Sequence, residues 1–269
     1  MALPAPAATC VIVLSQTGTS DTSVQAVVHA QAAGAATITL TAEMDSPIAR
    51  AAARTLHIPV GEEPVGPKTK GYAASLAALF QLGNWLDGRA TDAPVPVAEL
   101  AALLPRAEQA ASALAGELDG LDFVCIAGEG RHHGTAQEGS LKISEIAGMP
   151  SAAFTIEELL HGRLHGLSDR SLGIVIAATA EQKAAAENAA AVMRKHGVRI
   201  LVLDLCGGSG PFDWPGGMPA LAAPFDAIAG IVPMQWLAVA LARRRGMEPH
   251  RMRYPGLSQQ LGIKLARTA

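Results

Sequence analysis

Three charged side chains, Glu138, Lys142 and Glu145, have a spacing that suits proton-transfer chemistry. They stand at positions i, i+4 and i+7 of the segment EGSLKISE, so on a helix all three project from one face. One carboxylate can then take a proton from a carbon next to a carbonyl group, while the lysine keeps the other ionised or neutralises developing charge. The same spacing is typical of an exposed Glu–Lys pair that stabilises a helix by about 0.2–0.5 kcal/mol. Spacing alone leaves both interpretations open.

The stretch from Val11 to Thr22, VIVLSQTGTSDT, has the composition of an anion-binding loop. Its four apolar residues predict a short parallel strand buried on both faces, and the valines after it predict one face of a helix. Between them, hydroxyl side chains, free backbone N–H groups and the positive end of the helix can surround an anion. The loop has no lysine and no Walker glycines, which favours a sugar phosphate over a nucleoside triphosphate. The alternative is a serine or threonine helix cap followed by an ordinary turn.

Two further motifs are weaker. The glycines of GEGRHHG, Gly128 to Gly134, miss the dinucleotide pattern GxGxxG by one position, and the following strand ends without the acidic residue that would bind a ribose. The pairs His132–His133 and His161–His165 lack the helical HExxH arrangement, so the sequence predicts no metal site. His161 alone is a better candidate for an acid or base.

Composition favours a globular protein of the cytoplasm. Of 269 residues, 49% are hydrophobic and 17% charged, and the net charge of −3 provides no basic stripe for nucleic acid. The three cysteines show no metal-ligand spacing and fit a reducing compartment. The N-terminus lacks the basic region of a signal peptide, and no uninterrupted apolar run reaches membrane-spanning length. We therefore expect a soluble cytoplasmic protein with neither nucleic acid nor membrane as a partner.

Along the whole chain, strand-like and helix-like segments alternate. This alternation predicts an α/β fold with parallel sheets and right-handed crossovers. The predicted strands cover residues 11–14, 36–40, 56–60, 123–127, 152–155, 174–177, 200–205 and 227–232. The predicted helices include residues 47–54, 97–118, 133–147, 156–161, 181–196 and 233–245, with a further apolar helix after residue 70.

A Pro- and Gly-containing linker over residues 87–96 divides the chain into domains 1–96 and 97–269, the second of which includes a bridging helix and a C-terminal loop. The second half has about five predicted strands and the first about three. If the halves are duplicates, the first is N-terminally truncated and lacks two βα units, roughly 60 residues.

Five segments in the same order resemble the sugar isomerase (SIS) domain family, specifically the isomerase half of glucosamine-6-phosphate synthase and stand-alone two-SIS phosphosugar isomerases and deglycases. Residues 14–22 resemble the family's phosphate loop, SQSGET or SQSGTS, and residues 61–72 (GEEPVGPKTKGY) resemble its E-x-x-V-x-x-TK segment. Residues 128–145 are similar to its GRG turn and EGALKLKE helix, residues 156–162 (IEELLHG) to its E-L-x-HG segment, and residues 255–268 to its C-terminal loop. The resemblance runs nearly the full length.

The resemblance implies two SIS-type subdomains, each a flavodoxin-like three-layer αβα sandwich. It implies an isomerase or deaminase acting on a sugar 6-phosphate or amino-sugar phosphate through an enediol or enediolamine, with an aminotransferase- or deglycase-like reaction as a variant, and no cofactor. The alternatives are a non-catalytic phosphosugar sensor and an inactive fragment. Without a glutaminase domain, this chain by itself would not use glutamine.

The phosphate-binding positions of the family correspond to Ser15, Gln16, Thr17 and Ser20. The sugar phosphate would thus be held where the first strand turns into its helix.

The catalytic positions fall in the second half. Glu145 corresponds to the carboxylate that moves the proton between sugar C1 and C2, and Glu138 and Lys142 correspond to its supporting pair. His161 corresponds to a histidine that opens the sugar ring in the neighbouring subunit's site. The resemblance therefore implies a homodimer.

Two features depart from the family. The early GCGTS loop of the first domain is missing from this chain. Gln259 takes the place of the C-terminal lysine that forms a Schiff base with a keto-sugar in the synthase, so that step is either absent or carried out by another residue such as Lys264.

Overall fold

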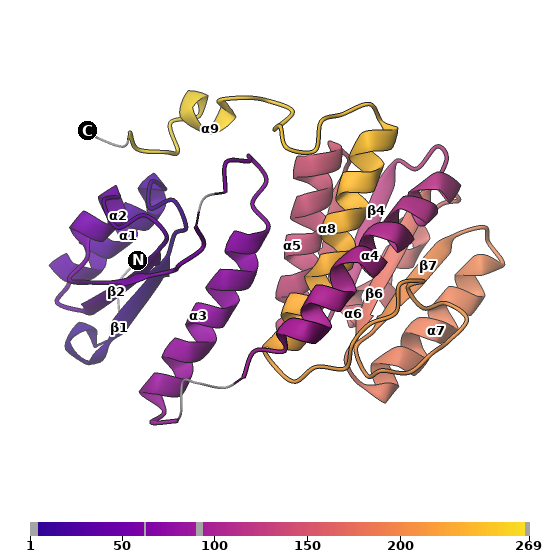
Figure 1. Cartoon of the computed structure of the whole chain (residues 1–269), viewed down its shortest axis with the longest axis horizontal. Coiled ribbons are helices and arrows are strands. Elements are labelled where there is room, and N and C mark those ends of the chain that lie inside the picture. Colours follow the sequence, from indigo (N-terminus) through magenta and orange to yellow (C-terminus); the bar gives the residue numbers. More distant parts are fainter. Residues whose placement is uncertain (1–4, 62, 90–93, 267–269) are drawn as a thin grey trace. The chain divides into compact units, whose positions relative to one another are not determined.

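The computed structural model describes residues 5–61, 63–89 and 94–266 (Figure 1). Contacts divide the chain into two compact units, one formed by Met1–Thr91 with Tyr254–Ala269 and one by Asp92–Arg253. Each unit holds one all-parallel sheet with helices on it, which confirms the predicted α/β class. The C-terminal segment, which the sequence analysis assigns to the second domain, makes its contacts within the first unit.

The sheet of the first unit has the strand order β1-β2-β3. Its elements are η1 (Pro6–Ala8), β1 (Cys10–Leu14), α1 (Asp21–Ala32), β2 (Ala36–Thr41), α2 (Pro47–Ala51), β3 (Arg54–His57), α3 (Lys70–Leu86) and α9 (Leu257–Gln260). Helices α1 and α2 pack on one face, where Val24, Val27 and Ile48 are buried together with Val13 of β1. Helix α3 covers the other face at β2, where Leu82 packs with Leu40. The unit therefore has three layers.

Strand β1 corrects one prediction, because it is not buried on both faces. Ile12 is 42% exposed and Leu14 is 37% exposed. Both point away from α1 and α2, and β1 is one of the two edge strands in the described part of this sheet. Helix α3 lies over β2, and a helix about 10 Å wide covers only about two strands spaced ~4.8 Å apart. The outer face of β1 is therefore left partly exposed. The apolar run predicts the strand's position but not its burial.

The sheet of the second unit has the strand order β5-β4-β6-β7. Its elements are α4 (Val97–Glu117), β4 (Phe123–Gly128), α5 (Arg131–Ala147), β5 (Ser151–Phe154), α6 (Ile156–Leu160), η2 (Arg163–Gly166), β6 (Ser171–Ala177), α7 (Ala180–Arg194), β7 (Arg199–Asp204) and α8 (Phe225–Arg244). Four residues of the predicted linker that precedes α4, residues 90–93, lie outside the described residues.

Helices cover both faces of this second sheet. Cys125 and Ala127 of β4 point to one face, where they pack with Leu159 of α6 and with alanines of α7. Ile126 points to the other face, where it lies close to Gly139 of α5. Helix α8 packs against α5 and also against α4, and Figure 1 shows these three helices side by side. Thus α5 and α6 lie on opposite faces of one sheet.

Helix α8 corrects a second prediction. Residues 227–232, predicted as a strand, lie inside this helix, which begins at Phe225 rather than at Pro233. A short apolar run has the same periodicity in a buried helix as in a buried strand, and a proline is typical of a helix start, so both local signals pointed to the wrong boundary. By length and composition α8 could also cross a membrane, but 78% of its most apolar window is buried inside the unit. That is the position of a core helix.

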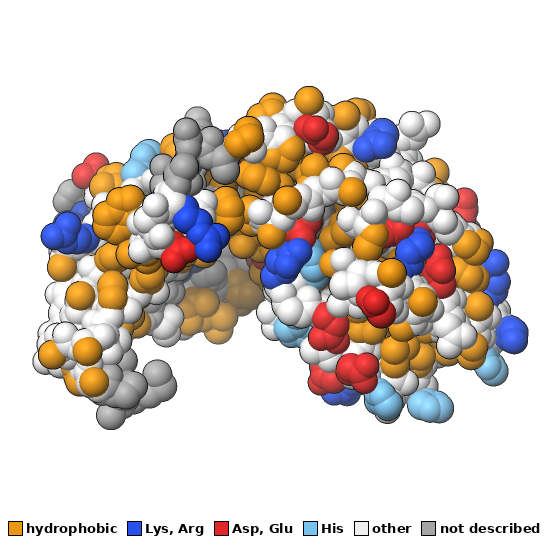
Figure 2. Space-filling model, turned by 90° about the horizontal axis from the view of Figure 1, so that it is seen from below, with side chains coloured by type: hydrophobic (Ala, Val, Ile, Leu, Met, Phe, Trp, Pro, Cys, Tyr) orange, Lys and Arg blue, Asp and Glu red, His pale blue; other side chains and the backbone are white. Residues whose placement is uncertain are grey.

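The surface view in Figure 2 shows acidic, basic and hydrophobic side chains intermingled rather than a continuous basic face. Several large hydrophobic side chains are exposed, among them Trp85 at 66% and Leu86 at 60% at the end of α3.

Candidate functional site

The turn between β4 and α5 positions the helix that carries the charged row. Gly128 ends β4, and a Cβ added there would lie 2.4 Å from the backbone oxygen of His132, so only glycine fits. Gly130 precedes the helix with a φ of 55°, a backbone conformation that glycine adopts at little cost. The side chain of Glu129 accepts a hydrogen bond from the backbone N–H of Glu157 at 3.2 Å, which ties this turn to α6.

Glu138, Lys142 and Glu145 lie together on α5, as their spacing predicts. The ammonium of Lys142 is 3.5 Å from Glu138 Oε1 and forms a close ion pair with Glu145 Oε2. The Lys142 side chain is only 3% exposed, whereas the side chains of Glu138 and Glu145 are 16% and 24% exposed. The cation is therefore buried beneath two carboxylates that both reach the surface. An exposed helix-stabilising pair would not bury its lysine in this way.

Burial and neighbouring charges act together on Glu138. Burial raises the pKa of Glu138 above its ordinary value, the attraction of Lys142 opposes that shift, and the like charge of Glu145 adds to it. The Glu138 carboxyl therefore holds a proton more readily than an ordinary glutamate, which suits a group that takes part in acid–base chemistry.

His161 is not brought to this group within one unit. It follows α6, whose start is fixed by a capping box between Thr155 and Glu158. The imidazole is 80% exposed and lies 3.1 Å from the carboxylate of Glu157. Helix α6, which His161 follows, and helix α5, which carries Glu145, cover opposite faces of the sheet.

The predicted anion loop lies in the first unit, between β1 and α1. Ser15 is buried at 8% exposure, and its N–H donates to the carbonyl of Leu40 at 3.0 Å. Gly18 has a φ of 63°, and a Cβ added there would lie 2.0 Å from Ser46 Oγ. The hydroxyls of Thr17 and Thr19 are hydrogen-bonded at 3.0 Å. The loop is thus a tight turn with several hydroxyl groups.

The start of α1 has unused donors. Ser20 is the N-cap residue, but its side chain caps no backbone N–H of the helix. Its hydroxyl lies instead 3.3 Å from that of Thr22. Within the described residues, the backbone N–H groups of Thr22 and Ser23 form no hydrogen bond. Free N–H groups at the positive end of a twelve-residue helix are suited to an anion.

Gln16 is fixed by a residue that the sequence analysis did not single out, Glu63. Glu63 Oε2 accepts from Gln16 Nε2 at 3.0 Å, and Oε1 accepts from the backbone N–H groups of Thr69 at 2.8 Å and Lys70 at 3.0 Å. Burial acts to raise the pKa of Glu63, but the hydrogen bonds from Thr69, Gln16 and Lys70 outweigh it and hold the pKa below its ordinary value. One carboxylate thereby joins the anion loop to the start of α3. Glu63 lies in the segment 61–72, which resembles the E-x-x-V-x-x-TK segment of the SIS family. That resemblance was the only sequence signal that pointed to Glu63.

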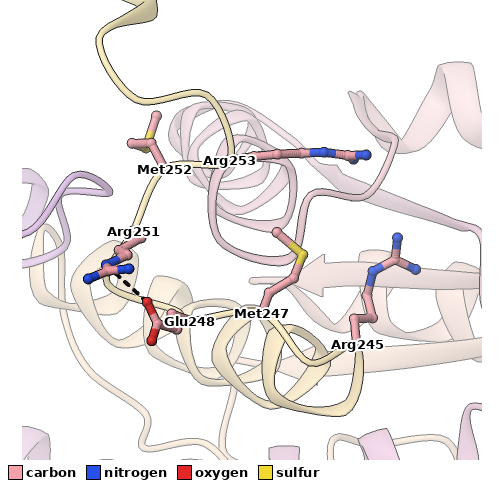
Figure 3. Close-up of a pocket in the computed structure, with 6 residues that line it drawn as sticks. All are labelled: Arg245, Met247, Glu248, Arg251, Met252 and Arg253. Carbon is pink, nitrogen blue, oxygen red and sulfur yellow. Dashed lines mark ion pairs between the residues drawn. The ribbon is translucent and has the colours of Figure 1, made fainter.

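A separate hollow of about 700 Å³ lies in the second unit after α8, and it contains none of the predicted site residues (Figure 3). It is lined by Arg245, Met247, Glu248, Arg251, Met252 and Arg253. The three guanidinium groups point in different directions, and Arg251 is paired with Glu248 at 2.9 Å. They do not converge on one anion.

Comparison with known proteins gives the same assignment over most of the chain. The profile of the SIS domain matches residues 2–84 and 123–210. A glutamine–fructose-6-phosphate aminotransferase of Mycolicibacterium smegmatis is 28% identical over 262 residues, covering 89% of this chain and 41% of that protein. An Arabidopsis thaliana enzyme of the same name is 27% identical over 257 residues, covering 87% of this chain and 37% of that protein. The chain thus spans about two fifths of the length of these relatives.

Solved structures share the fold. A provisionally named phosphosugar isomerase of Clostridium difficile superposes with a TM-score of 0.81 at 20% identity, covering 95% of this chain and 76% of that chain. A glucosamine-6-phosphate deaminase of Thermotoga maritima superposes with a TM-score of 0.72 at 22% identity, covering 91% of this chain and 73% of that chain.

Proposed function

Because this chain belongs to the SIS domain family, we propose that it is an enzyme acting on a phosphorylated keto- or amino-sugar. The reaction is a proton transfer between neighbouring sugar carbons through an enediol or enediolamine, with or without release of an amine. The names of the relatives support this substrate class, since they act on fructose 6-phosphate and the similar structures include a glucosamine-6-phosphate deaminase.

The observation that carries the proposal is the buried ammonium of Lys142 between two carboxylates. In the proposed mechanism, the loop that contains Ser15, Gln16, Thr17 and Ser20 holds the phosphate. Glu145 removes a proton from the carbon next to the sugar carbonyl and returns it to the neighbouring carbon. Glu145 carries the proton between these two steps, and Lys142 offsets negative charge that develops on the enediol.

We further propose that the active unit is a homodimer in which His161 serves the site of the other copy. The exposure of His161 supports this, as does its position across the sheet from α5. An exposed imidazole can open the sugar ring of a substrate held by a second subunit, whereas it has no route through the sheet of its own.

The experiment is proton exchange with solvent. The purified chain is incubated in D₂O with fructose 6-phosphate or glucosamine 6-phosphate, and deuterium at sugar C1 and C2 is followed by NMR. The wild-type chain should incorporate deuterium, and Glu145→Gln should slow this by about 10²–10⁴-fold. Binding of the sugar phosphate should change little in that variant. Equal loss of binding and exchange would contradict the role assigned to Glu145.

A second variant tests the phosphate loop. Ser15→Ala combined with Thr17→Ala should weaken binding of the sugar phosphate. The exchange rate under saturating substrate should change less than the affinity. If unphosphorylated fructose binds as well as fructose 6-phosphate, the loop assignment is wrong. If the wild-type chain binds sugar phosphates and the NMR spectra show neither exchange nor conversion of the sugar, the protein is a phosphosugar sensor, which the glutamine at position 259 would favour.

A further inference from the structure

The C-terminal segment of the first unit forms a short antiparallel pairing with the anion loop. The backbone N–H of Leu265 donates to the carbonyl of Thr19 at 2.8 Å, and the N–H of Asp21 donates to the carbonyl of Ile263 at 3.2 Å. Between these two hydrogen bonds, Ser20 and Lys264 stand directly opposite each other. Residues more than 240 positions apart in the sequence are thus aligned one to one.

This pairing fixes where the Lys264 side chain leaves the backbone. Because the hydrogen bonds flank Ser20 and Lys264 rather than join them, the two form a non-hydrogen-bonded antiparallel pair. In such a pair the Cα atoms are about 4.5 Å apart and both side chains project from the same face. The Lys264 side chain therefore leaves the backbone on the face of the ladder that carries the Ser20 side chain, and its length lets the ammonium reach an anion there.

Lys264 is exposed and, among the residues that the structure describes, no carboxylate forms an ion pair with it. The anion loop itself, residues 15–23, contains no basic residue, and its one charged side chain is that of Asp21. A sugar phosphate carries a charge of about −1.5 to −2 at neutral pH. Hydroxyl and backbone N–H groups donate hydrogen bonds to it but leave that charge unbalanced.

We propose that Lys264 supplies the cation of the anion loop and that its ammonium binds the phosphate group of the substrate beside Ser20. The inference rests on the proposed function, because it adds a binding residue to the same site. It also gives the C-terminal segment a role, since the segment must be paired with the loop for the charge to be in place.

This arrangement couples ligand binding to the order of the segment. Large apolar side chains of the segment are mostly exposed: Leu261 is 61% and Ile263 50% exposed. A phosphate bound by both the loop and Lys264 stabilises the paired state, because it binds that state in preference to the detached one.

Equilibrium binding to the full chain tests the proposal. Fructose 6-phosphate, inorganic phosphate and unphosphorylated fructose are titrated into the wild type and into Lys264→Met, Lys264→Arg and Lys195→Met. Lys195→Met is the matched control, because it removes the same charge from an exposed position at the end of α7 in the other unit. Thermal unfolding verifies that each variant is folded.

Lys264→Met should weaken binding of fructose 6-phosphate and of inorganic phosphate about tenfold or more, and should make the remaining affinity less sensitive to salt. The affinity of Lys264→Arg should stay within about threefold of that of the wild type, and the affinity of Lys195→Met should equal that of the wild type. As a second measurement, fructose 6-phosphate should slow tryptic cleavage after Lys264 in the wild-type chain.

The outcomes separate this inference from the proposed function. If the wild type binds fructose 6-phosphate and Lys264→Met binds it equally well, Lys264 is not a phosphate ligand, although the loop and the enzyme proposal stand. If Lys264→Met weakens the binding of unphosphorylated fructose as much as the binding of fructose 6-phosphate, the lysine does not act on the phosphate and the inference is wrong. If the wild type binds neither sugar phosphates nor inorganic phosphate, the proposed function fails as well.

Discussion

Gln16 enters the anion loop with its side chain held by Glu63. A Cβ added at Gly71 would lie 2.1 Å from Gln16 Oε1, so the amide is confined on that side as well. Its NH₂ group faces the carboxylate, which fixes the orientation of an otherwise flexible side chain. Glu63 is therefore a positioning residue, since it acts on the loop through Gln16 and through the first N–H groups of α3.

We expect Glu63→Gln to lower the free energy of unfolding by about 1 kcal/mol at neutral pH, because an amide accepts fewer of these hydrogen bonds and turns a donor toward donors. The effect should depend on pH. The pKa of Glu63 is lowered in the folded state, so its contribution is complete above the ordinary value of 4.5 and is lost as the pH falls through the folded-state pKa. The difference between wild type and variant should shrink on acidification.

Urea unfolding of both proteins, from about pH 7 to about pH 3, measures this difference. Glu99→Gln removes the same charge from an exposed carboxylate in the first turn of α4 and serves as the matched control. A difference between wild type and Glu63→Gln that stays constant over the acidic range would show that the hydrogen-bonded carboxylate is not its source.

The charged row on α5 could be predicted in part from the sequence, whereas the Gln16–Glu63 pair could not. The joint placement of Glu138, Lys142 and Glu145 follows from the helical repeat, so it could be predicted. The burial of Lys142 could not, since it depends on what packs around α5. Glu63 meets Gln16 across 47 positions of sequence, and no spacing rule connects a loop after β1 with the residues before α3.

At the scale of elements, the turn between β4 and α5 is the most constrained part of the candidate site. We expect Gly128→Ala to destabilise the protein by about 3 kcal/mol, because its Cβ would overlap the backbone oxygen of His132, which cannot rotate away. Any relaxation must move the start of α5, so proton exchange should fall as well. Urea unfolding and the deuterium assay measure the two effects.

Gly134, on an exposed position of the same helix, is the matched control. A Cβ added there meets nothing within 4 Å. Gly134→Ala should therefore raise the free energy of unfolding by about 0.5–1 kcal/mol, since alanine loses less backbone entropy in a helix. Destabilisation by both substitutions would mean that α5 tolerates no added methyl group and that the clash at Gly128 is not specific.

The elements themselves were predictable where a periodic pattern extends over many residues, as in α5 and α7, and where apolar runs are bounded by turns, as in β4 and β6. Residues 227–232 were predicted as a strand because burial on all sides erases the periodicity that separates strand from helix. The exposure of Ile12 and Leu14 depends on which strands α3 covers. That is a property of packing which the local sequence does not contain.

At the scale of the whole molecule, the proposed homodimer rests on the separation of two catalytic candidates. His161 is 80% exposed and follows α6, which covers the face of the sheet opposite α5, the helix that carries Glu145. We therefore propose that the two residues that act on one substrate come from different copies of the chain. A closed symmetric dimer would then contain two such sites, each with Glu145 from one copy and His161 from the other.

This separation predicts complementation between two inactive variants. Glu145→Gln and His161→Ala should each lose most activity as pure proteins, but a mixed dimer combines an intact His161 from one copy with an intact Glu145 from the other at one of its sites. After unfolding and refolding of an equal mixture, half the dimers are mixed, so about one quarter of wild-type activity should return. Refolding each variant alone controls for recovery by the procedure. If no activity returns although size measurements show mixed dimers, His161 and Glu145 serve sites within one copy or His161 takes no part, because only a site shared between copies can be rebuilt from these two halves.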